Sequence, residues 1–454
     1  MQSSKKRPSD APSPGNTYDH DMLRDQPMAS DIEKKKDLSV VVRLLLFFIM
    51  MQPPWHQFQH QARINWYPGH MVKALRSIKS RMAQDEIGAL LEVRDMRAPL
   101  SCINARFEHF LQDQAKPARG LVFKNAWGEV VGRKVTRPRR MILYNKCDLV
   151  GGIKATASWQ RYLVQYHRQK LRCNDSIYFT HTQAQDQACI GAEQVLFDTV
   201  RWWVDHHRPR LLATPSKPYP PLNILVMGLP NTGKSSIINA LRVEGMGMGA
   251  HGSRKIAPTG KEPGFTRSVS SKIKLVDTET IRDTRVGHID NDVGGQKDTN
   301  IMRYLKREQV RLKVFIMDSP GVLAPNFSDT EVAVRLSLIH CVPNDVSGLR
   351  GADVGLLSEY LWWKMVKVWG MSNAYLRRQG IVATETPDDP SCAWLLQQLA
   401  RKRIAHSNPL SSHQLAVEAQ HFVKSWQDGS LYMQTLKLPR NQWPQMILDD
   451  QIHL

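Results

Sequence analysis

The chain has 454 residues and a formal net charge of +20, from 62 Lys and Arg against 42 Asp and Glu. This length allows two or three domains with ample core, and the charge favours a polyanionic partner, with simply solvated charges as the alternative. The six cysteines show no C-x-x-C pair and no metal-ligand spacing, which argues against a metal site held by cysteines and indicates free thiols in a reducing compartment.

The N-terminal part is polar, and we assign residues 1–60 to a disordered or targeting region. Residues 1–40 carry few apolar groups, which predicts disorder, and their acidic residues argue against an import signal there. The apolar run at 38–51, interrupted by Arg43, is shorter than the about 20 residues of a membrane span. It is a signal-like segment, an interfacial helix or a buried helix.

A second start of the chain fits the composition better. No acidic residue occurs between Asp37 and Asp85, whereas basic residues do. Mitochondrial presequences are rich in Arg and poor in acids. A presequence beginning at Met50 or Met51 would therefore match, and an N-terminus before it would not.

Residues 65–83 are predicted to form a turn at Pro68-Gly69 and then a basic amphipathic helix with apolar residues at helical spacing. The further elements predicted in chain order are a strand at 87–93, a helix at 104–111, a β-like pattern at 121–131, a strand at 141–144, a helix at 158–168, a strand at 176–180 and a helix at 194–206. A Pro-rich linker is predicted at 209–221.

The strand at 141–144 ends in Asn145-Lys146-Cys147-Asp148, which fits the N-x-x-D guanine reader of GTPases in its N-K-x-D form. A carboxylate at Asp148 can accept two hydrogens from guanine N1 and N2, and the Asn145 amide can serve O6. Adenine presents the opposite donor and acceptor pattern. Alone, this short motif is weak because surface turns produce it often.

An apolar strand from Ile224 leads into Gly228-Leu-Pro-Asn-Thr-Gly-Lys-Ser, the G-x-x-x-x-G-K-[ST] phosphate loop in its strand-to-helix context. The glycines let the backbone wrap an anion, and the N–H groups at the helix start point at it. Lys234 is expected to reach the outer phosphates and Ser235 to hold Mg²⁺. The residues assigned to the loop are Gly228, Asn231, Thr232, Gly233, Lys234, Ser235 and Ser236. The alternative, a Gly-rich turn that starts a helix, is the weaker interpretation.

Two further segments follow the loop. Pro263-Gly-Phe-Thr266 is a candidate switch whose threonine supplies a second hydroxyl on the magnesium side. A strand from Val314 ends in Asp318-Ser-Pro-Gly321, a D-x-P-G motif. The motif order is therefore reader, phosphate loop, switch threonine and D-x-P-G, whereas ordinary GTPases place the reader last.

In this order the chain resembles the circularly permuted GTPases of the YlqF/RbgA family and its mitochondrial ribosome-assembly members. Two further segments match, Trp66-Tyr-Pro-Gly-His-Met-Val-Lys-Ala74 and Glu92-Val-Arg-Asp-Met-Arg-Ala-Pro-Leu100, together with a helical tail. The resemblance runs from about Asn65 to Leu436.

The resemblance implies an α/β fold: a circularly permuted P-loop GTPase domain at 61–327, mainly a parallel sheet with flanking helices, followed by a small all-α domain at 328–436. A tail at 437–454 remains. Two stretches are longer than the family needs, and we interpret 116–138 and 277–308 as insertions.

The resemblance also names a catalyst. Common GTPases orient the attacking water with a Gln after the D-x-x-G glycine, but Val322 stands there and an apolar side chain cannot do this. The family supplies His70 instead, which is expected to turn toward the γ-phosphate. The alternative is an ordinary turn histidine bonded to the backbone.

For the cofactors, the resemblance implies Mg²⁺ held by Ser235 and Thr266. GTPases with an Asn at the position of Asn231 are often activated by K⁺, although a local backbone bond is the alternative for this side chain. The loop that backs guanine in the family follows the strand at 176–180. Residues 180–182, Thr-His-Thr, match its pattern only loosely.

The first functional hypothesis is a GTP-hydrolysing assembly factor that binds rRNA of the large ribosomal subunit, as a monomer in the mitochondrial matrix or on the matrix side of the inner membrane. Cytoplasm or nucleolus is the alternative location. Basic residues of the helical domain that could face RNA phosphates are Arg377, Arg378, Arg401, Lys402 and Arg403. The alternatives are a GTP-regulated scaffold or membrane-associated switch with little turnover, and an ATP-using P-loop enzyme, which Asp148 disfavours.

Overall fold

The computed structural model describes residues 69–83, 87–115, 122–124, 130–133, 138–171, 175–181, 191–213, 219–246, 272–278, 299–322, 329–342, 354–381, 390–403, 410–431 and 446–450. All of these belong to one compact unit, Pro54–Leu454. The region predicted at 1–60, including the apolar run at 38–51, lies outside the described residues.

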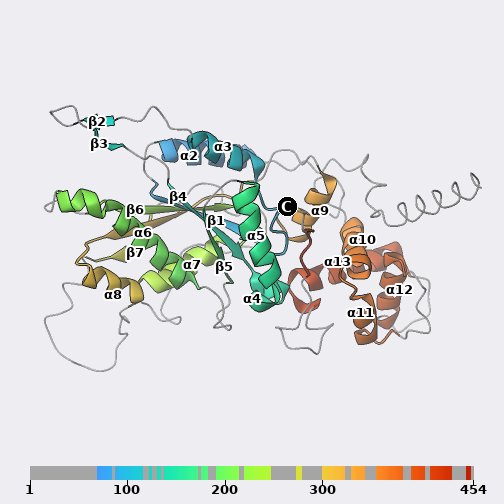
Figure 1. Ribbon diagram of the computed structural model, residues 1–454. Coiled ribbons are helices and arrows are strands. Elements are labelled where there is room, and N and C mark those ends of the chain that lie inside the picture. The colour runs from blue at the N-terminus through green and yellow to red at the C-terminus, as the bar shows by residue number, and fades with distance from the viewer. Residues whose placement is uncertain are drawn as a thin grey trace, which may run out of the picture. The chain divides into compact units, whose positions relative to one another are not determined.

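A six-stranded sheet forms the centre of this unit, in the order β5-β4-β1-β6-β8-β7 (Figure 1). The strands are β1 (Ala89–Asp95), β4 (Arg139–Asn145), β5 (Ser176–Phe179), β6 (Leu222–Gly228), β7 (Ile273–Asp277) and β8 (Lys313–Asp318). All neighbouring strands pair in parallel except β7, which runs antiparallel to β8 at the edge. The strand predictions are confirmed within a few residues at each end.

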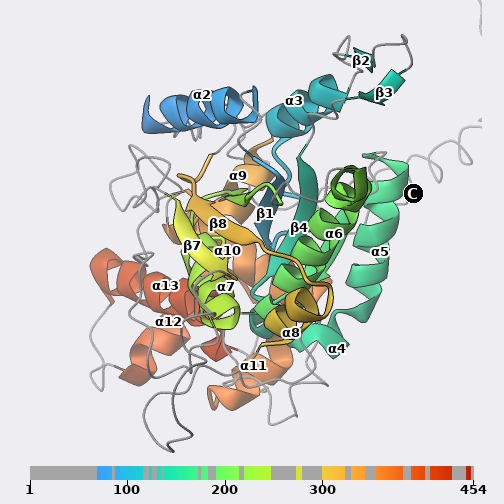
Figure 2. The same cartoon turned by 90° about the vertical axis from the view of Figure 1, so that its left-hand side faces the viewer.

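Helices cover both faces of the sheet, as Figures 1 and 2 show. One face carries α2 (Gly69–Ala83), α3 (Ala105–Ala115) and α5 (Ala157–Gln169), and the other carries α6 (Ala192–Ala213), α7 (Lys234–Met246) and α8 (Asn300–Arg307). In β6, Ile224 and Val226 face the second group of helices, whereas Leu225 and Met227 face the first. An unbroken apolar run is what a strand covered on both faces requires.

Four short elements also belong to this part of the chain. The β-like pattern at 121–131 is confirmed as an antiparallel pair, β2 (Val122–Lys124) with β3 (Val130–Arg133). After β4, a 3-10 turn η2 (Cys147–Val150) and α4 (Gly152–Ala155) lead into α5.

A group of helices follows β8. They are α9 (Thr330–Leu338), α10 (Val354–Trp363), a π-helical turn (Lys364–Val368), α11 (Ser372–Arg378), α12 (Cys392–Arg403) and α13 (Ser412–Gln427). The Asp329 side chain caps α9, and Ser411 forms a capping box with Gln414 at α13. Their apolar stripes share one core, as predicted. That core also contains Met71, Ala98 and Leu229 of the sheet domain, so the two parts are packed together.

Two local interpretations need correction. The linker predicted from Pro209 starts too early, because α6 continues to Ala213. A proline removes one backbone bond of a helix, yet α6 continues through Pro209. In the stretch interpreted as an insertion at 277–308, residues 300–307 form α8, whose Ile301 and Leu305 belong to the core under the sheet.

Residues 446–450, within the predicted tail, are packed between the two parts. Met446 and Leu448 are fully buried and join the core of the helical part. Ile447 instead joins the cluster formed by β4 and α5. Among the described helices, none is long and apolar enough to cross a bilayer.

Candidate nucleotide site

The parallel pairing brings four strand ends to one edge of the sheet. Asp95 of β1 pairs with Asn145 of β4, Val93 of β1 with Gly228 of β6, and Val226 of β6 with Asp318 of β8. In open α/β sheets, ligands bind at the carboxyl ends of such strands. The reader and the phosphate loop are thus neighbours in space although 145 and 228 are far apart in the chain.

The phosphate loop needs its glycines for close backbone contacts. Gly228 ends β6 with φ +146°. At Gly233, where φ is +98°, a Cβ atom would lie 2.3 Å from Nδ2 of Asn145. At Gly321 it would lie 2.5 Å from the backbone nitrogen of Pro230. Any side chain at Gly233 or Gly321 would therefore push the loop away from the reader or from the end of β8.

The start of α7 holds the groups expected to meet phosphate and metal. Lys234 is buried, and its ammonium donates to the carbonyl of Leu229 at 2.7 Å. Burial lowers the pKa of Lys234, and the Asp318 carboxylate counteracts this. Ser235 Oγ donates to Asp318 Oδ2 at 3.2 Å. A hydroxyl beside a carboxylate is an oxygen-only set that suits Mg²⁺, so this pair fits the expected ion. Ser236 follows in the same first turn.

The reader lies directly against the loop. Asn145 is fully buried; its Nδ2 donates to the Thr232 carbonyl at 3.1 Å, and its Oδ1 accepts from Thr180 Oγ1 at 3.3 Å. Lys146 has φ +64°, and its ammonium donates to the Asn231 carbonyl at 2.5 Å. Asp148 lies in the first turn of η2 and is partly exposed. The motif thus continues from the end of β4 into η2, where the Asp148 side chain is partly exposed.

Sequence reasoning missed two residues that hold the reader. Asp95, at the end of β1, forms an ion pair with Lys146 at 2.9 Å and a bidentate pair with Arg97. Burial raises the pKa of Asp95, but Arg97 and Lys146 outweigh it and hold this pKa well below its usual range. Arg97 also donates to the Gln427 carbonyl of α13 at 2.9 Å and lies over the Trp426 ring. Both residues lie in the segment 92–100, which matches the family, but its sequence alone gave neither of them a role.

The helical part contacts the phosphate loop itself. Asn231 Nδ2 donates to the His340 carbonyl at 2.9 Å, and Cys341 Sγ donates to the Pro230 carbonyl at 3.0 Å. Both partners stand just after α9, where His340 has φ +62°. Burial, then the charges of Arg97 and Lys146, lowers the pKa of His340 to about 4. These two hydrogen bonds therefore couple the conformation of the phosphate loop to that of the first turn after α9.

A buried ionic cluster lies behind the reader strand. Its members from β1, α3, β4 and α5 are Glu92, Arg94, Glu108, Arg140, Tyr144 and His167. Burial raises the pKa of Glu92, but Arg140 and Arg94 outweigh it and lower it to about 2. Burial, followed by the charges of Arg94 and Arg140, lowers the pKa of His167 to about 3. Because Arg94 only donates, Nε2 of His167 accepts from it and from the Tyr144 hydroxyl.

Other predicted residues are placed only in part. Thr266 lies outside the described residues. His70 is in the first turn of α2, and its side chain also lies outside them; the next residue, Met71, is fully buried in the core that contains Leu229 of the phosphate loop. Val322 is 5% exposed, packed under α2 and α3. Both ring nitrogens of His181, in the loop after β5, are buried without a hydrogen-bond partner in the described part of the chain.

Comparisons with known proteins agree with this geometry. The family model described as 50S ribosome-binding GTPase matches residues 223–342, which include the phosphate loop and Asp318 but not the reader. Mitochondrial GTPase 1 of Schizosaccharomyces pombe is 26% identical over 64% of this chain and 68% of its own length. Mitochondrial ribosome-associated GTPase 1 of Mus musculus is 28% identical over 62% of each chain. Ribosome biogenesis GTPase A of Bacillus pumilus is 24% identical over 64% of this chain and 73% of its own.

A solved structure of GDP-bound TM YlqF aligns over 78% of this chain and 95% of that chain, with 18% identity and a TM-score of 0.36. The strand order and the site define the class without it: a P-loop GTPase in which the reader strand β4 precedes the phosphate-loop strand β6. Within this class the chain resembles the YlqF/RbgA-type ribosome-associated GTPases.

Proposed function

We propose that this GTPase is an assembly factor for the large ribosomal subunit of mitochondria, which binds rRNA in its GTP state and leaves after hydrolysis. The observation that carries the proposal is the contact of a guanine reader with a phosphate loop, Asn145 Nδ2 to the Thr232 carbonyl at 3.1 Å, in a chain of net charge +20. The names of the relatives, which include a mitochondrial ribosome-associated GTPase and a ribosome biogenesis GTPase, support the partner and the organelle.

Nucleotide binding would use the groups at the sheet edge. Asp148 would accept from guanine N1 and N2, while the loop N–H groups and Lys234 hold the phosphates. The Lys234 ammonium has three donors, so it can contact a phosphate while it keeps its bond to the Leu229 carbonyl. Ser235, Thr266 and Asp318 would hold Mg²⁺, which neutralises phosphate charge when bound.

Hydrolysis requires a group that orients water, and we assign this role to His70. The buried position of Val322 leaves no polar side chain at the usual place. In support, the residue after His70, Met71, belongs to the same buried core cluster as Leu229 of the phosphate loop. Asn231 is the proposed K⁺ ligand. Its Nδ2 is engaged by the His340 carbonyl, and a cation would be held by its amide oxygen.

Subunit binding is tested by cosedimentation of the full chain with large ribosomal subunits in GTP, in GDP and in ATP, over a series of salt concentrations. We expect binding in GTP only, with an affinity that falls steeply with salt, by roughly 0.7 to 0.9 log units per log unit of salt for each phosphate contact. Lys234→Ala should abolish nucleotide binding and GTP-dependent sedimentation together. Equal sedimentation in all three nucleotides would overturn the proposal.

The organelle is tested by imaging the full chain beside one that starts at Met50. Mitochondrial import of either form supports the proposal, and cytoplasmic or nucleolar retention of both contradicts the location. The alternative of a membrane-associated switch predicts binding to lipid vesicles without subunits. The same preparations can be tested for that by flotation.

A further inference from the structure

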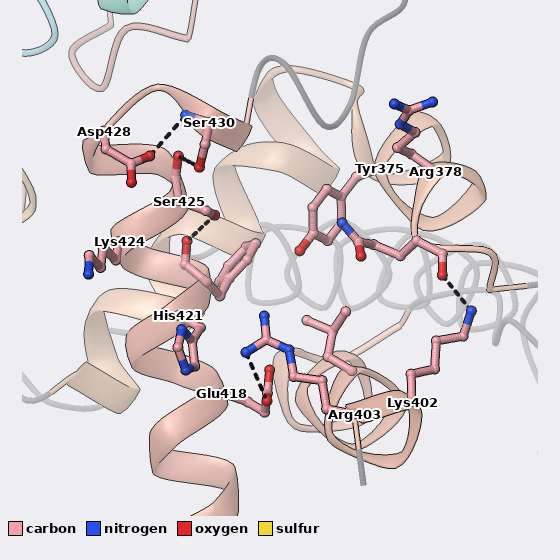
Figure 3. A pocket seen from close by; sticks show the side chains of 13 residues that line it. Tyr375, Arg378, Lys402, Arg403, Glu418, His421, Lys424, Ser425, Asp428 and Ser430 are labelled. Atoms are coloured by element: carbon pink, nitrogen blue, oxygen red, sulfur yellow. Dashed lines mark hydrogen bonds and ion pairs between the residues drawn. The ribbon is translucent and has the colours of Figure 1, made fainter. Parts of the chain in front are cut away.

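A cavity of about 480 Å³ opens between α11, α12 and α13 of the helical part (Figure 3). Its size lies in the range of small-ligand sites. The cationic side chains around it are Arg378, Lys402, Arg403 and Lys424. Against these, the cavity has two acidic residues, Glu418 and Asp428. Its rim is therefore predominantly positive.

The floor of the cavity is apolar and aromatic. Tyr375, Leu399 and Phe422 line it and are 3%, 8% and 2% exposed. Figure 3 shows the Tyr375 ring extending from α11 into the space between the other two helices. Tyr375 and Phe422 also contact each other, with ring centroids 5.7 Å apart. The two ring planes are tilted by 55°. An apolar floor under a cationic rim matches what a base and its phosphate require.

The buried Glu418 carboxylate, a hydrogen-bond acceptor, distinguishes this cavity from a simple anion-binding site. Glu418 is 5% exposed, and its carboxylate lies 3.4 Å from the Arg403 guanidinium. A dashed line in Figure 3 marks this ion pair. A carboxylate disfavours a phosphate in the interior, but it accepts well from the amino and imino groups of a base. The charges thus place the phosphate at the rim and the base inside.

The basic residues also have a simpler role, because cations in the last turn of a helix interact favourably with its dipole. Arg377 and Arg378 both stand in the last turn of α11, and Arg401 and Lys402 in that of α12. Only Arg378 and Lys402 of these line the cavity. Any helix-dipole role is shared by all four residues, so the two that line the cavity can be compared with the two that do not.

We infer that this cavity binds one unpaired nucleotide of single-stranded RNA, with the phosphate at Arg378, Lys402 and Lys424, the base against Tyr375, and Glu418 accepting from the base. This rests on the proposed function and names the RNA feature that the helical part recognises. Uracil fits worst, because its single Watson–Crick N–H is flanked by two carbonyl oxygens. Adenine, cytosine and guanine each carry an amino group for Glu418.

The test measures binding of the full chain to short fluorescent oligoadenylate, oligocytidylate and oligouridylate, and to a duplex RNA of equal length. The double variant Arg378→Glu with Lys402→Glu is compared with Arg377→Glu with Arg401→Glu, which changes the charge equally on the same two helix turns. We expect the first pair to weaken oligoadenylate binding about tenfold or more, and the second about threefold or less. The salt slope should fall by roughly 1.4 for the first pair, from two lost contacts at about 0.7 each.

Base recognition is tested with Glu418→Gln, which keeps the side-chain volume. Wild type should prefer oligoadenylate and oligocytidylate to oligouridylate by about fivefold or more, and the variant should lose most of this preference. GTP hydrolysis should be unchanged in all three variants, since none of these residues contacts the nucleotide site; this shows that they are folded.

Three results would overturn the inference while leaving the proposed function standing. The first is an equal loss of oligoadenylate affinity in the two charge-reversal variants, and the second is the absence of a base preference in wild type. The third is cosedimentation with subunits without binding of any single-stranded oligonucleotide. A wild type that binds neither subunits nor RNA would remove the proposed function, and this inference with it.

Discussion

At the level of single residues, guanine specificity depends on Asp148. The partly exposed carboxylate stands in the turn after a fully buried Asn145, so base recognition is separated from the packing of the strand. Replacing its charge with an amide should therefore change the ligand without disturbing the fold.

Asp148→Asn should weaken GTP binding about tenfold or more, because a hydrogen bond to a charged group is lost. It should strengthen binding of xanthosine triphosphate, whose changed edge suits an amide. Competition titrations with GTP, ATP and xanthosine triphosphate measure both effects. Wild-type protein that binds ATP as well as GTP would contradict the assignment of Asn145 and Asp148 as the reader.

His70→Ala should lower turnover about a hundredfold with little change in GTP affinity, since a group that orients water acts in the transition state. Single-turnover hydrolysis on the ribosomal subunit, in K⁺ and again in Na⁺, is the measurement. The variant should stay on the subunit with GTP bound. If both proteins hydrolyse GTP equally fast, His70 is an ordinary helix-start residue and the catalyst is elsewhere.

At the level of elements, the buried cluster joins β1 and β4 to α3 and α5 and makes folding sensitive to pH. His167 has a pKa near 3 in the folded chain and about 6.5 when unfolded, so the unfolded chain binds the proton first. Its contribution to stability is complete above pH 6.5 and is lost as the pH falls below that value. The carboxylate of Glu92 adds its own loss only at lower pH, below its unfolded pKa of about 4.5.

Between pH 6 and pH 4.5 the free energy of unfolding should fall by about 1.4 kcal/mol per pH unit through His167, with His340 adding to the slope. His167→Gln keeps an acceptor for Arg94 and Tyr144 but cannot titrate, so its slope should be smaller by about that amount. Urea unfolding at a series of pH values gives both slopes. The matched control, His413→Gln on the exposed side of α13, should retain the wild-type slope.

The segment 446–450 links the turn after β1 to α9 through hydrogen bonds. The Asp449 carboxylate accepts from the backbone nitrogens of Leu100 and Ser101, from the Ser101 hydroxyl and from the Arg335 guanidinium. Only 3% of Asp449 is exposed, so these donors have no ready access to water once the carboxylate is gone.

Asp449→Ala should therefore lower the free energy of unfolding by about 3 kcal/mol or more, as expected when one partner of a buried charge pair is removed. Ser101→Ala, which removes one hydroxyl of the same group, should cost only about 1 kcal/mol. The midpoint of urea unfolding compares them. Equal, small shifts of this midpoint would mean that the segment 446–450 contributes little to stability.

At the level of the whole molecule, sequence patterns predicted what is local. The phosphate loop, the reader and the strands before them are encoded in short runs whose periodicity and glycines leave few conformations. The contacts that join them are not local: Arg97 meets Gln427 across 330 residues, and Ser101 meets Asp449 across 348. No spacing rule predicts which buried arginine pairs with which distant carbonyl. Asp95, His340 and the 446–450 segment were missed for this reason.

The central position of β1 has a consequence for how the chain folds during synthesis. Its first partner β4 follows soon, but its second partner β6 is made only after β5 and α6. Until then one long edge of β1, buried along its whole length in the finished protein, has nothing to pair with. Exposed apolar strand edges recruit other chains. A nascent chain that stops before Leu222 should therefore aggregate or bind chaperones, and folding should become productive only when the phosphate-loop strand emerges to close that edge.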